Sequence, residues 1–476
     1  MVSKIVSPIS TPSRPFHFLE LHELAHSIRR RDISATEATS CLLTRIDALD
    51  SQLHSFAAVM AASALDQAAH ADARLAAGEG AGPLLGVPVA VKDLCWTAGQ
   101  ATAAGMPLHR DFVPTIDATI VSRLRAAGAV IIGKTQLTEG AYSDHHPDIA
   151  APRNPWGGDY WPGISSSGSG VALAAGLCYG AIGTDTGGSI RWPSAANGVT
   201  GLKPTWGRVS RHGIFALAPS LDHVGVMARS ARDASYLFQA IAGSDPLDPT
   251  AVQAPVADYV GAIDAGLAGL RVGIDPDWVE AGIDPEVAAV VADVARELAA
   301  LGATLIDVQL PDPEPAVAAW FPICAVEAAV AHEATYPKRG AVYGPVLAWV
   351  LDAGRALSAM AYQHALLERA TFRGRWAAAT QGVDMVLTPA QPMVPLTLET
   401  ISTLGTQPEL VAALQRFTCP FNLTGSPSLT FPGGAASSGL PIGVQLVGQD
   451  LDEASLFRAV GAYQLVTAWH RRHPQL

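Results

Sequence analysis

Short apolar runs alternate with amphipathic segments along most of the chain. Six short runs, most of them rich in valine, isoleucine and leucine, have the length and composition of strands: 87–91, 129–132, 181–184, 270–274, 304–308 and 385–388. Segments with the apolar spacing of helices lie between them. Because strands that alternate with helices form mostly parallel sheets, the pattern predicts an α/β fold. Its central β-sheet should be mixed, mostly parallel and twisted, with helices covering both faces.

Capping signals place several of the expected helices. The first should begin near Leu19, and the second should follow Ser34, since Ser34 and Glu37 form a capping box in which each side chain satisfies a backbone donor of the other. A third, alanine-rich helix should follow these two. A later helix has Asp284 as its cap and Pro285 at its first position, which suits a residue that lacks an N–H.

The chain is expected to form one domain. Its 476 residues are 49% hydrophobic and 16% charged, which suffices for a large core. The segment 244–255 is the best linker candidate, but another strand and helix follow it at once. We therefore predict a single domain over residues 1–476 with its core at about 18–470. The least readable part, 315–415, is interpreted as a variable region on the substrate side.

Net charge and cysteine content indicate which classes of binding partner and which cellular compartment to expect. With 31 basic and 43 acidic residues the net charge is −12, which argues against binding to nucleic acid or an anionic membrane and favours a small-molecule partner. The five cysteines include no CxxC pair and are interpreted as free thiols, with a thiol nucleophile as the open alternative. The opening residues lack an apolar signal core, so we expect a cytoplasmic protein. The sequence leaves open whether it is a monomer or a homodimer.

Three motif matches are treated as weak. The stretch 22–26, HELAH, matches the zinc motif HExxH, but the helix already has an ordinary buried stripe and no GxxH follows. The stretch 128–135, GAVIIGKT, matches GxxxxGK[ST], yet its four consecutive apolar residues predict a strand where a phosphate loop must coil. The stretch 144–148, DHHPD, is interpreted as a solvated loop because adjacent histidines on extended chain point apart.

Two clusters of serine and glycine carry the candidate chemistry. Residues 165–170 lead into a helix, and residues 184–189 end a strand. A glycine pair directly before Ser189 lets successive backbone N–H groups converge, as an oxyanion hole requires. The candidate donors are Thr186, Gly187, Gly188 and Ser189. Ser189 is then the candidate nucleophile.

Lys92 is the candidate base for that nucleophile. It closes the apolar strand of GVPVAVKDL, in a chain with only five lysines, and neither GxSxG nor SxxK is present. Burial can push a lysine toward neutrality, whereas an arginine stays charged. The alternative is a structural lysine that reaches solvent or pairs with the neighbouring Asp93.

These motifs together resemble the amidase signature family, whose members are serine hydrolases with a Ser-cisSer-Lys triad that act on C–N bonds. The resemblance covers nearly the whole chain. It includes GVPVAVKDL, GAVIIGKT, the serine-glycine block, GTDTGGSIRWPSAANGVTGLKPTWGRVSRHG, NLTGSPSLTFPGG and GLPIGVQLVG. It implies the amidase signature fold and a reaction that needs no cofactor and no metal.

The resemblance also assigns roles by position. Lys92 corresponds to the triad lysine, Ser165 to the cis-serine and Ser189 to the serine that is acylated. The remaining positions that it implies are Asp185 and Arg191 with Ser166 as structural support, and Ala141 with Tyr142 at an edge of the substrate pocket.

Two positions depart from the usual GGSSGGS of the family. Ile164 and Ser167 stand where glycines are common. We still expect a cis peptide bond between Ile164 and Ser165, and we expect Ile164 to narrow the pocket or change which substrates fit.

The expected reaction is hydrolysis of a neutral aryl or alkyl amide through an acyl-enzyme on Ser189, with carbamates and esters as further substrates. Aromatic residues near the motifs favour bulky apolar groups: Tyr142, Trp156, Trp161, Trp192, Trp206 and Phe421. The alternative within the family is the glutaminase subunit of a tRNA-dependent amidotransferase. The alternatives outside the family are a zinc peptidase that uses the HELAH motif and a binding protein without catalytic activity.

Overall fold

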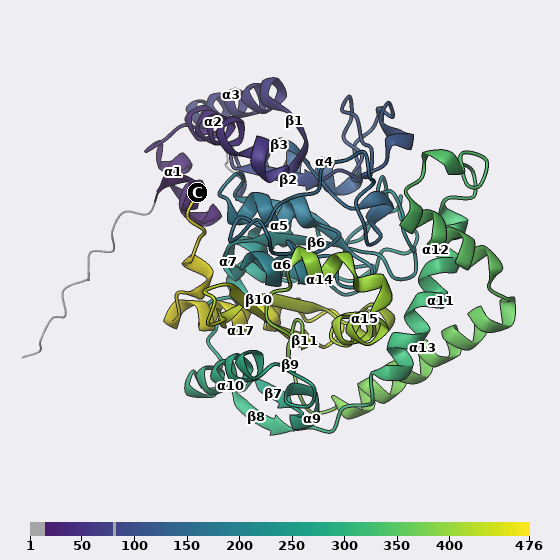
Figure 1. Cartoon of the computed structure of the whole chain (residues 1–476). Helices are drawn as coiled ribbons and strands as arrows, with labels where there is room; N and C mark the ends of the chain where they lie inside the picture. The colour runs from purple at the N-terminus through teal and green to yellow at the C-terminus, as the bar shows by residue number, and fades with distance from the viewer. Residues whose placement is uncertain (1–14, 80–81) are drawn as a thin grey trace, which may run out of the picture.

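A single sheet of eleven strands runs through the protein (Figure 1), in the order β1-β3-β2-β4-β6-β5-β10-β11-β9-β7-β8. The computed structural model describes residues 15–79 and 82–476; the opening stretch 1–14, on which part of the cytoplasmic prediction rests, lies outside them. The strands are β1 Phe56–Val59, β2 Pro88–Lys92, β3 Val130–Thr135, β4 Gly180–Asp185, β5 Thr200–Lys203, β6 His223–Ala228, β7 Arg271–Ile274, β8 Thr304–Asp307, β9 Met385–Pro389, β10 Ser428–Ala435 and β11 Pro441–Gly448.

All six predicted strands are present, as β2, β3, β4, β7, β8 and β9, and the predicted mixed α/β sheet is confirmed. The expected parallel majority is wrong. Four neighbouring pairs are parallel and six are antiparallel. Every parallel pair joins two predicted strands, whereas every antiparallel pair includes one of the five strands that the sequence did not reveal: β1, β5, β6, β10 or β11.

The described part of the chain contains seventeen α-helices, which surround this sheet. They are α1 Leu21–Arg30, α2 Ala35–Leu53, α3 Ala61–Ala76, α4 Thr119–Ala126, α5 Ser167–Ala174, α6 Arg191–Asn197, α7 Ala231–Ile241, α8 Tyr259–Ala262, α9 Pro276–Val279, α10 Pro285–Ala300, α11 Glu314–Ala331, α12 Pro345–Ala356, α13 Ala359–Ala379, α14 Leu398–Ser402, α15 Pro408–Gln415, α16 Cys419–Thr424 and α17 Glu453–Val466. Short 3-10 turns occur at Phe16–Phe18, Pro107–His109, Glu139–Ala141, Gly340–Val342, Leu404–Thr406 and Trp469–Arg471.

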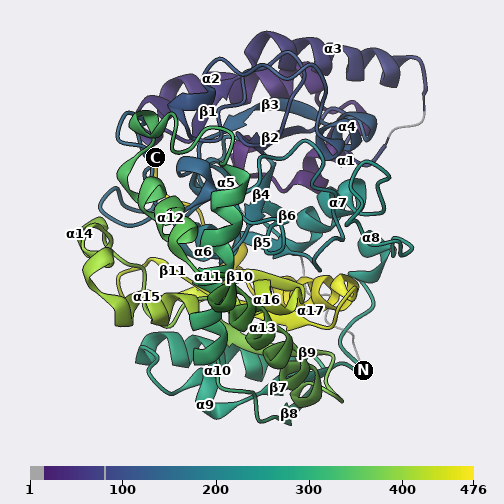
Figure 2. The ribbon, with the colours of Figure 1, turned by 90° about the vertical axis from the view of Figure 1, so that its right-hand side faces the viewer.

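Helices cover both faces of the sheet, as strand β11 shows. Gly443 lies against Ala195 of α6, and Gly448, five residues further on, lies against Leu456 of α17. Positions an odd number of residues apart on a strand face opposite sides. Figure 1 and Figure 2 show α5, α6, α7, α10 and α17 around this sheet.

The predicted capping signals act as expected. The Ser34 side chain accepts a hydrogen bond from the Glu37 N–H at 3.0 Å, and the Glu37 carboxylate accepts one from the Ser34 N–H at 2.8 Å. Asp284 caps α10 through the Glu286 N–H at 2.8 Å. The first helix begins at Leu21, two residues after the expected start.

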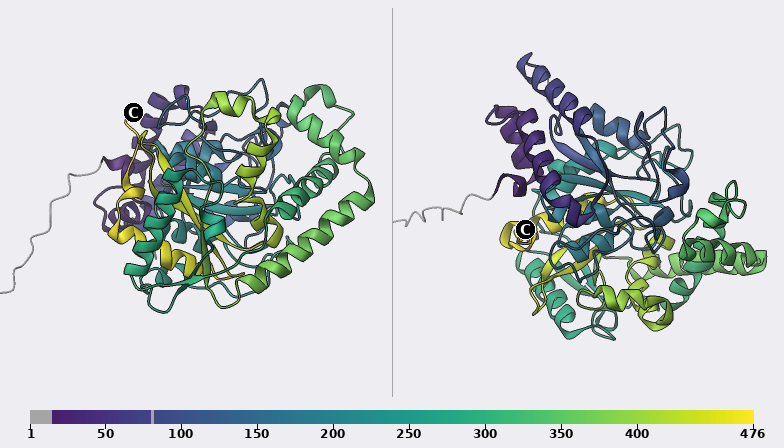
Figure 3. Two further views of the ribbon diagram at one scale, coloured as in Figure 1. Left: turned by 60° about the horizontal axis from the view of Figure 1, so that its bottom comes forward. Right: turned by 45° about the horizontal axis from the view of Figure 1, so that its top comes forward.

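The poorly readable region 315–415 is mainly helical. Helix α11 packs against both α12 and α13, and the three helices stand along one side of the molecule (Figure 2 and Figure 3). Among the described helices, α11 meets the length and composition of a membrane span, with a mean hydropathy of 1.3. Its apolar sequence is interrupted by Glu327, and its side chains Ile323 and Cys324 are fully buried in the core.

The candidate linker 244–255 does not separate two cores. It has no regular structure, and Asp245 and Asp248 within it accept hydrogen bonds from the Ser210 hydroxyl and the Arg211 N–H. The strands after it, β7 to β9, join the same sheet as those before it. The chain is therefore a single-domain α/β protein.

The buried Asp233 of α7 anchors the start of α1. Its carboxylate accepts hydrogen bonds from the N–H groups of Leu21 and His22 at 2.8 and 3.1 Å. It also contacts the His22 ring at 2.8 Å. These bonds satisfy donors that a helix start leaves without partners.

We expect Asp233→Ala to lower the free energy of unfolding by about 2–3 kcal/mol, because two buried backbone donors lose their acceptor. Urea denaturation at pH 7 measures the change. The control is Asp264→Ala, which removes an exposed partner of Arg232 and should cost under about 1 kcal/mol. Equal effects of the two variants would contradict this anchoring role.

Candidate active site

Lys92 ends strand β2 with its amine sealed inside the protein. Its exposed fraction is 0%. The Nζ atom lies 2.7 Å from Ser165 Oγ, 3.0 Å from Ser166 Oγ and 2.8 Å from Thr184 Oγ1. Ser166 Oγ donates its own proton to the carbonyl of Thr184 at 3.2 Å, so it accepts from Lys92. The structure thus brings the predicted lysine and cis-serine into direct contact.

Among the described residues, no carboxylate forms an ion pair with the Lys92 amine. The neighbouring Asp93 pairs instead with Lys134, whose Nζ lies 3.2 Å from Asp93 Oδ1. Lys134 also donates to the Cys95 carbonyl and the Thr102 hydroxyl, both at 2.8 Å. The alternative interpretation of Lys92 as an ion-paired lysine beside Asp93 is therefore wrong.

Burial dominates the electrostatics of this lysine. Removal from water is the largest influence and lowers the pKa of Lys92 to about 7, while Cys95, Asp185 and Asp222 act in the opposite direction. A substantial fraction of the amine is then neutral near pH 7. A neutral amine retains a lone pair that can accept a proton from the Ser165 hydroxyl.

The peptide bond between Ile164 and Ser165 is cis, as expected. Ser165 and Ser166 are fully buried. The Ile164 side chain packs against a small apolar cluster that contains Trp161 and Trp192. Ile164 therefore forms part of the wall beside the serine loop, and whether it selects substrates stays a prediction.

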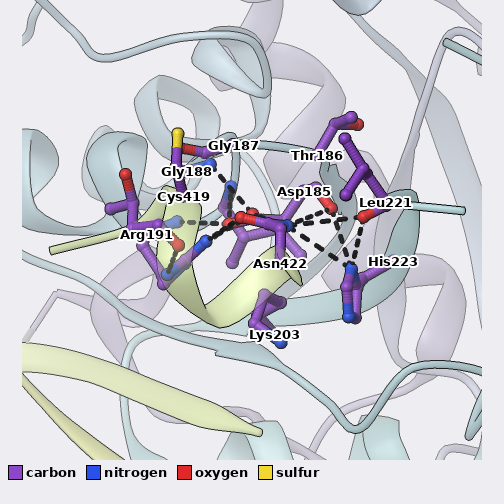
Figure 4. A network of polar contacts seen from close by, with 12 residues as sticks. Asp185, Thr186, Gly187, Gly188, Arg191, Lys203, Leu221, His223, Cys419 and Asn422 are labelled. Carbon is purple, nitrogen blue, oxygen red and sulfur yellow. Dashed lines mark hydrogen bonds and ion pairs between the residues drawn. The ribbon is translucent and has the colours of Figure 1, made fainter. Parts of the chain in front are cut away.

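Asp185 and Arg191 hold the turn that carries Ser189 (Figure 4). The guanidinium donates from Nε and Nη2 to the two carboxylate oxygens at 3.0 and 2.8 Å, with both side chains fully buried. Burial alone would raise the pKa of Asp185, but Arg191 outweighs it and keeps that pKa well below its usual range. Asn422 of α16 completes the network, donating to Asp185 Oδ1 at 2.9 Å.

The turn leaves some backbone donors free, though not all those expected. Among the described residues, the N–H groups of Thr186, Gly187 and Ser189 have no recorded intramolecular acceptor. The N–H of Gly188 donates to Asp185 Oδ1 at 2.9 Å. The Gly188 N–H is therefore occupied by the bracing carboxylate in this structure, and its role as an oxyanion donor stays a prediction.

Ser189 itself stands at the edge of this network. It is 7% exposed, and its hydroxyl has no recorded hydrogen bond to the described residues. Its carbonyl accepts from the Ser166 N–H at 3.1 Å, which joins the two serine-bearing turns through the backbone. The structure thus places the proposed nucleophile beside the proposed relay without a direct Ser165–Ser189 hydroxyl bond.

Two cavities adjoin each other near the site, and the smaller one reaches the turn that carries Ser189. The smaller, about 130 Å³, is lined by Ala141, Thr184 and Thr186 among others. The larger, about 660 Å³, is lined mainly by apolar side chains of α11 and of the segments around Met106 and Phe215. The cavities share Leu94, Phe215, Ala216 and Pro219 in their walls.

The residues predicted to line the substrate pocket do not all lie at one cavity. Ala141 lines the smaller cavity and has a positive φ of 64°. Tyr142 follows it and is half-buried. Of the aromatic residues expected near the pocket, Phe421 is fully buried in the main core, and Trp206 stacks with Arg211 at 4.9 Å. Trp161 and Trp192 form the cluster beside Ile164.

The weak motifs resolve largely as expected. Residues 130–135 of the GKT match form strand β3, so they make no phosphate loop. In HELAH, His22 turns to Asp233 while His26 is exposed. Ligand atoms of Glu20, His22 and Asp233 lie within 4.8 Å of one another, but this group does not use the HExxH pair. The DHHPD segment is less solvated than expected, because His146 is buried and His145 lies 3.2 Å from Ser167 Oγ.

Several site residues had weak signals or none in the sequence. Thr184 lies in the serine-glycine block, and Asn422 begins the NLTGSPSL motif. Both residues therefore stand in recognised motifs, but neither motif indicated which group the residue would contact. Trp320 of α11 had none. Its indole N–H donates to the Thr186 carbonyl at 2.8 Å from a helix whose sequence is mostly apolar.

The site thus combines a buried amine among hydroxyl groups with a braced glycine turn that has free N–H groups. The amidase family model matches residues 37–457, and the chain belongs to that family. It is 50% identical over 458 residues to "Putative amidase AmiD" of Mycobacterium tuberculosis, covering 96% of each chain.

Two further comparisons agree with this assignment. The chain is 40% identical over 489 residues to a glutamyl-tRNA(Gln) amidotransferase subunit of Roseiflexus castenholzii, covering 97% of this chain and 98% of that one. It is similar to the crystal structure of a peptide amidase in complex with the competitive inhibitor chymostatin. There the TM-score is 0.83 and the identity 31%, over 96% of this chain and 99% of that one.

We expect Asp185→Asn to lower the free energy of unfolding by about 3–5 kcal/mol, because it leaves the Arg191 guanidinium buried without its counter-charge. Urea denaturation at pH 7 measures it. Asp293→Asn is the control, since its pair with Arg296 is exposed and should matter by less than about 1 kcal/mol. A difference below about 1 kcal/mol between the variants would show that the pair does not brace the turn.

Proposed function

We propose that the protein hydrolyses neutral aryl or alkyl amides through an acyl-enzyme on Ser189. The observation that carries the proposal is the fully buried Lys92 amine, which lies 2.7 Å from the Ser165 hydroxyl and has no carboxylate partner in the described part of the chain. Such an amine can serve as a general base near neutral pH.

The proposed reaction passes a proton along the two serines. Neutral Lys92 takes the proton of Ser165 as Ser165 takes that of Ser189, whose Oγ attacks the amide carbonyl. The N–H groups of Thr186, Gly187 and Ser189 stabilise the oxyanion. The relay then returns the proton to the departing amine, and water hydrolyses the ester by the same steps in reverse.

The larger cavity supports a neutral substrate. Its lining residues include no lysine or arginine, and the two histidines, His109 and His332, have pKa values lowered by burial, that of His332 to about 4. The charged side chain in the wall is Glu327, whose carboxylate accepts from the Ser220 N–H at 2.7 Å. An apolar cavity of this volume suits an aryl or alkyl group.

The glutaminase component of an amidotransferase is the second candidate, favoured by the 40% identity to the Roseiflexus castenholzii protein. A free glutamine carries a carboxylate that needs a cationic partner. In the smaller cavity, Arg211 could serve, but its guanidinium already donates to Thr250 Oγ1 at 2.6 Å and stacks on Trp206. We therefore favour the free hydrolase, with carbamates and esters as further substrates.

A panel of substrates tests the proposal. We expect the purified single chain to hydrolyse p-nitroanilides with apolar acyl groups and to release no ammonia from glutamine. Ser189→Ala should lower the anilide rate by at least about 10³-fold, because the nucleophile is lost. Wild-type activity in Ser189→Ala would refute the acyl-enzyme, and glutamine hydrolysis without anilide hydrolysis would support the amidotransferase interpretation.

The pH profile tests the state of Lys92. Because the amine must be neutral and its pKa is about 7, kcat/KM should rise about tenfold per pH unit below that value and level off above it. Initial rates between pH 5 and 9 with one anilide measure this. A profile that is flat through pH 6–8, or that rises only near pH 10, would contradict a neutral base.

A further inference from the structure

Hydrogen bonds donated to its carbonyl oxygens hold the turn that carries Ser189. Each of five successive carbonyl oxygens accepts a hydrogen bond from a group outside the turn or at its end (Figure 4 shows several of these groups). The donors are Asn422 Nδ2 to Asp185 O at 3.1 Å, Trp320 Nε1 to Thr186 O at 2.8 Å, Cys419 Sγ to Gly187 O at 3.5 Å, Trp192 N to Gly188 O at 2.8 Å and Ser166 N to Ser189 O at 3.1 Å.

Fixing a carbonyl also fixes the next N–H. In a planar trans peptide the C=O and the N–H of the following residue point in opposite directions. The bond from Trp320 to the Thr186 carbonyl therefore aims the N–H of Gly187 away from α11. The same reasoning accounts for Gly188, whose N–H is directed to the Asp185 carboxylate at 2.9 Å.

The indole ring also blocks the alternative orientation of this peptide. A Cβ atom on Gly187 would lie 2.6 Å from Trp320 Cζ2, so the ring is in close contact with the glycine backbone. Trp320 is 6% exposed. The Thr186 side chain is fixed separately, since its hydroxyl donates to Asp222 Oδ1 at 2.6 Å. Trp320 is thus the side chain that holds the Thr186–Gly187 peptide plane.

We propose that Trp320 is a positioning residue for the oxyanion hole. By holding the Thr186 carbonyl, its indole N–H keeps the Gly187 N–H directed at the oxyanion that forms when Ser189 attacks. This inference rests on the proposed function, because it assumes a serine nucleophile. It assigns to α11, in the region with no motif, a part in stabilising the transition state.

Trp320→Phe tests the inference, since it keeps an aromatic ring against Gly187 and removes the N–H. We expect kcat for an anilide to fall on the order of 10-fold to 100-fold, less than the 10²–10³ lost when an oxyanion donor is deleted outright. KM should change by less than about threefold, because the contact acts on the transition state. The rate at which a fluorophosphonate labels Ser189 should fall by a similar factor, since its phosphoryl oxygen occupies the same site.

Two further variants separate positioning from general stability. Trp349→Phe makes the same change on α12, where the side chain is 59% exposed, and should leave all three quantities unchanged. Trp320→His restores a ring donor, because imidazole Nε2 occupies the position of indole Nε1. It should retain more of kcat and of the labelling rate than Trp320→Phe at equal urea midpoint.

The outcomes distinguish this inference from the proposed function. Rates of Trp320→Phe within twofold of Trp349→Phe would overturn the inference, as would a loss confined to KM, which would make Trp320 a substrate contact. A histidine variant slower than the phenylalanine variant would also overturn it. If Ser189→Ala is still labelled at the wild-type rate, the proposed function fails instead.

Discussion

The site depends on one buried amine whose partners are all hydroxyls. Lys92 has three such partners, Ser165, Ser166 and Thr184, and the nearest carboxylate along the chain, Asp93, is taken by Lys134. A lysine paired with a carboxylate would stay protonated, whereas desolvation without a counter-charge favours the neutral form. The pairing of Asp93 with Lys134 is therefore as important to the site as the contacts of Lys92 itself.

Elements distant in sequence converge around the turn that carries Ser189. The nucleophile turn follows β4, its carboxylate brace uses Arg191 of α6 and Asn422 of α16, and its carbonyls accept from α11 and α16. Most backbone groups in the turn have a fixed partner, so the few free N–H groups point in defined directions. Such preorganisation lets the donors meet a developing oxyanion without rearrangement.

Much of the fold and of the proposed site could be predicted from local signals. Short, mainly apolar runs revealed every strand that pairs in parallel. Strands β2, β3, β4 and β9 are buried along their whole length, as expected of parallel strands covered on both faces, whereas the edge strand β8 is mostly exposed. Strands β5, β10 and β11 are rich in glycine, proline or polar residues and are held by tertiary pairing, so their sequence carries no such signal.

What the sequence could not supply was the partner of each group. Gly188 matched an oxyanion donor by position, but the carboxylate that takes its N–H is defined only by the folded turn. Trp320 could not be found because α11 is apolar over most of its length, and nothing local distinguishes a tryptophan that fills the core from one that also donates to a peptide. Asn422 stood in a recognised motif, yet its role required the sheet to bring it to Asp185.

The protonation state of Lys92 is the central claim, and it can be measured directly. Only five lysines are present, so 13C-labelling at lysine Cε gives few NMR signals, and Lys92→Met assigns the relevant one. The account requires that signal to titrate near pH 7 in the folded protein. A signal that stays that of an ammonium up to pH 9 would contradict the account.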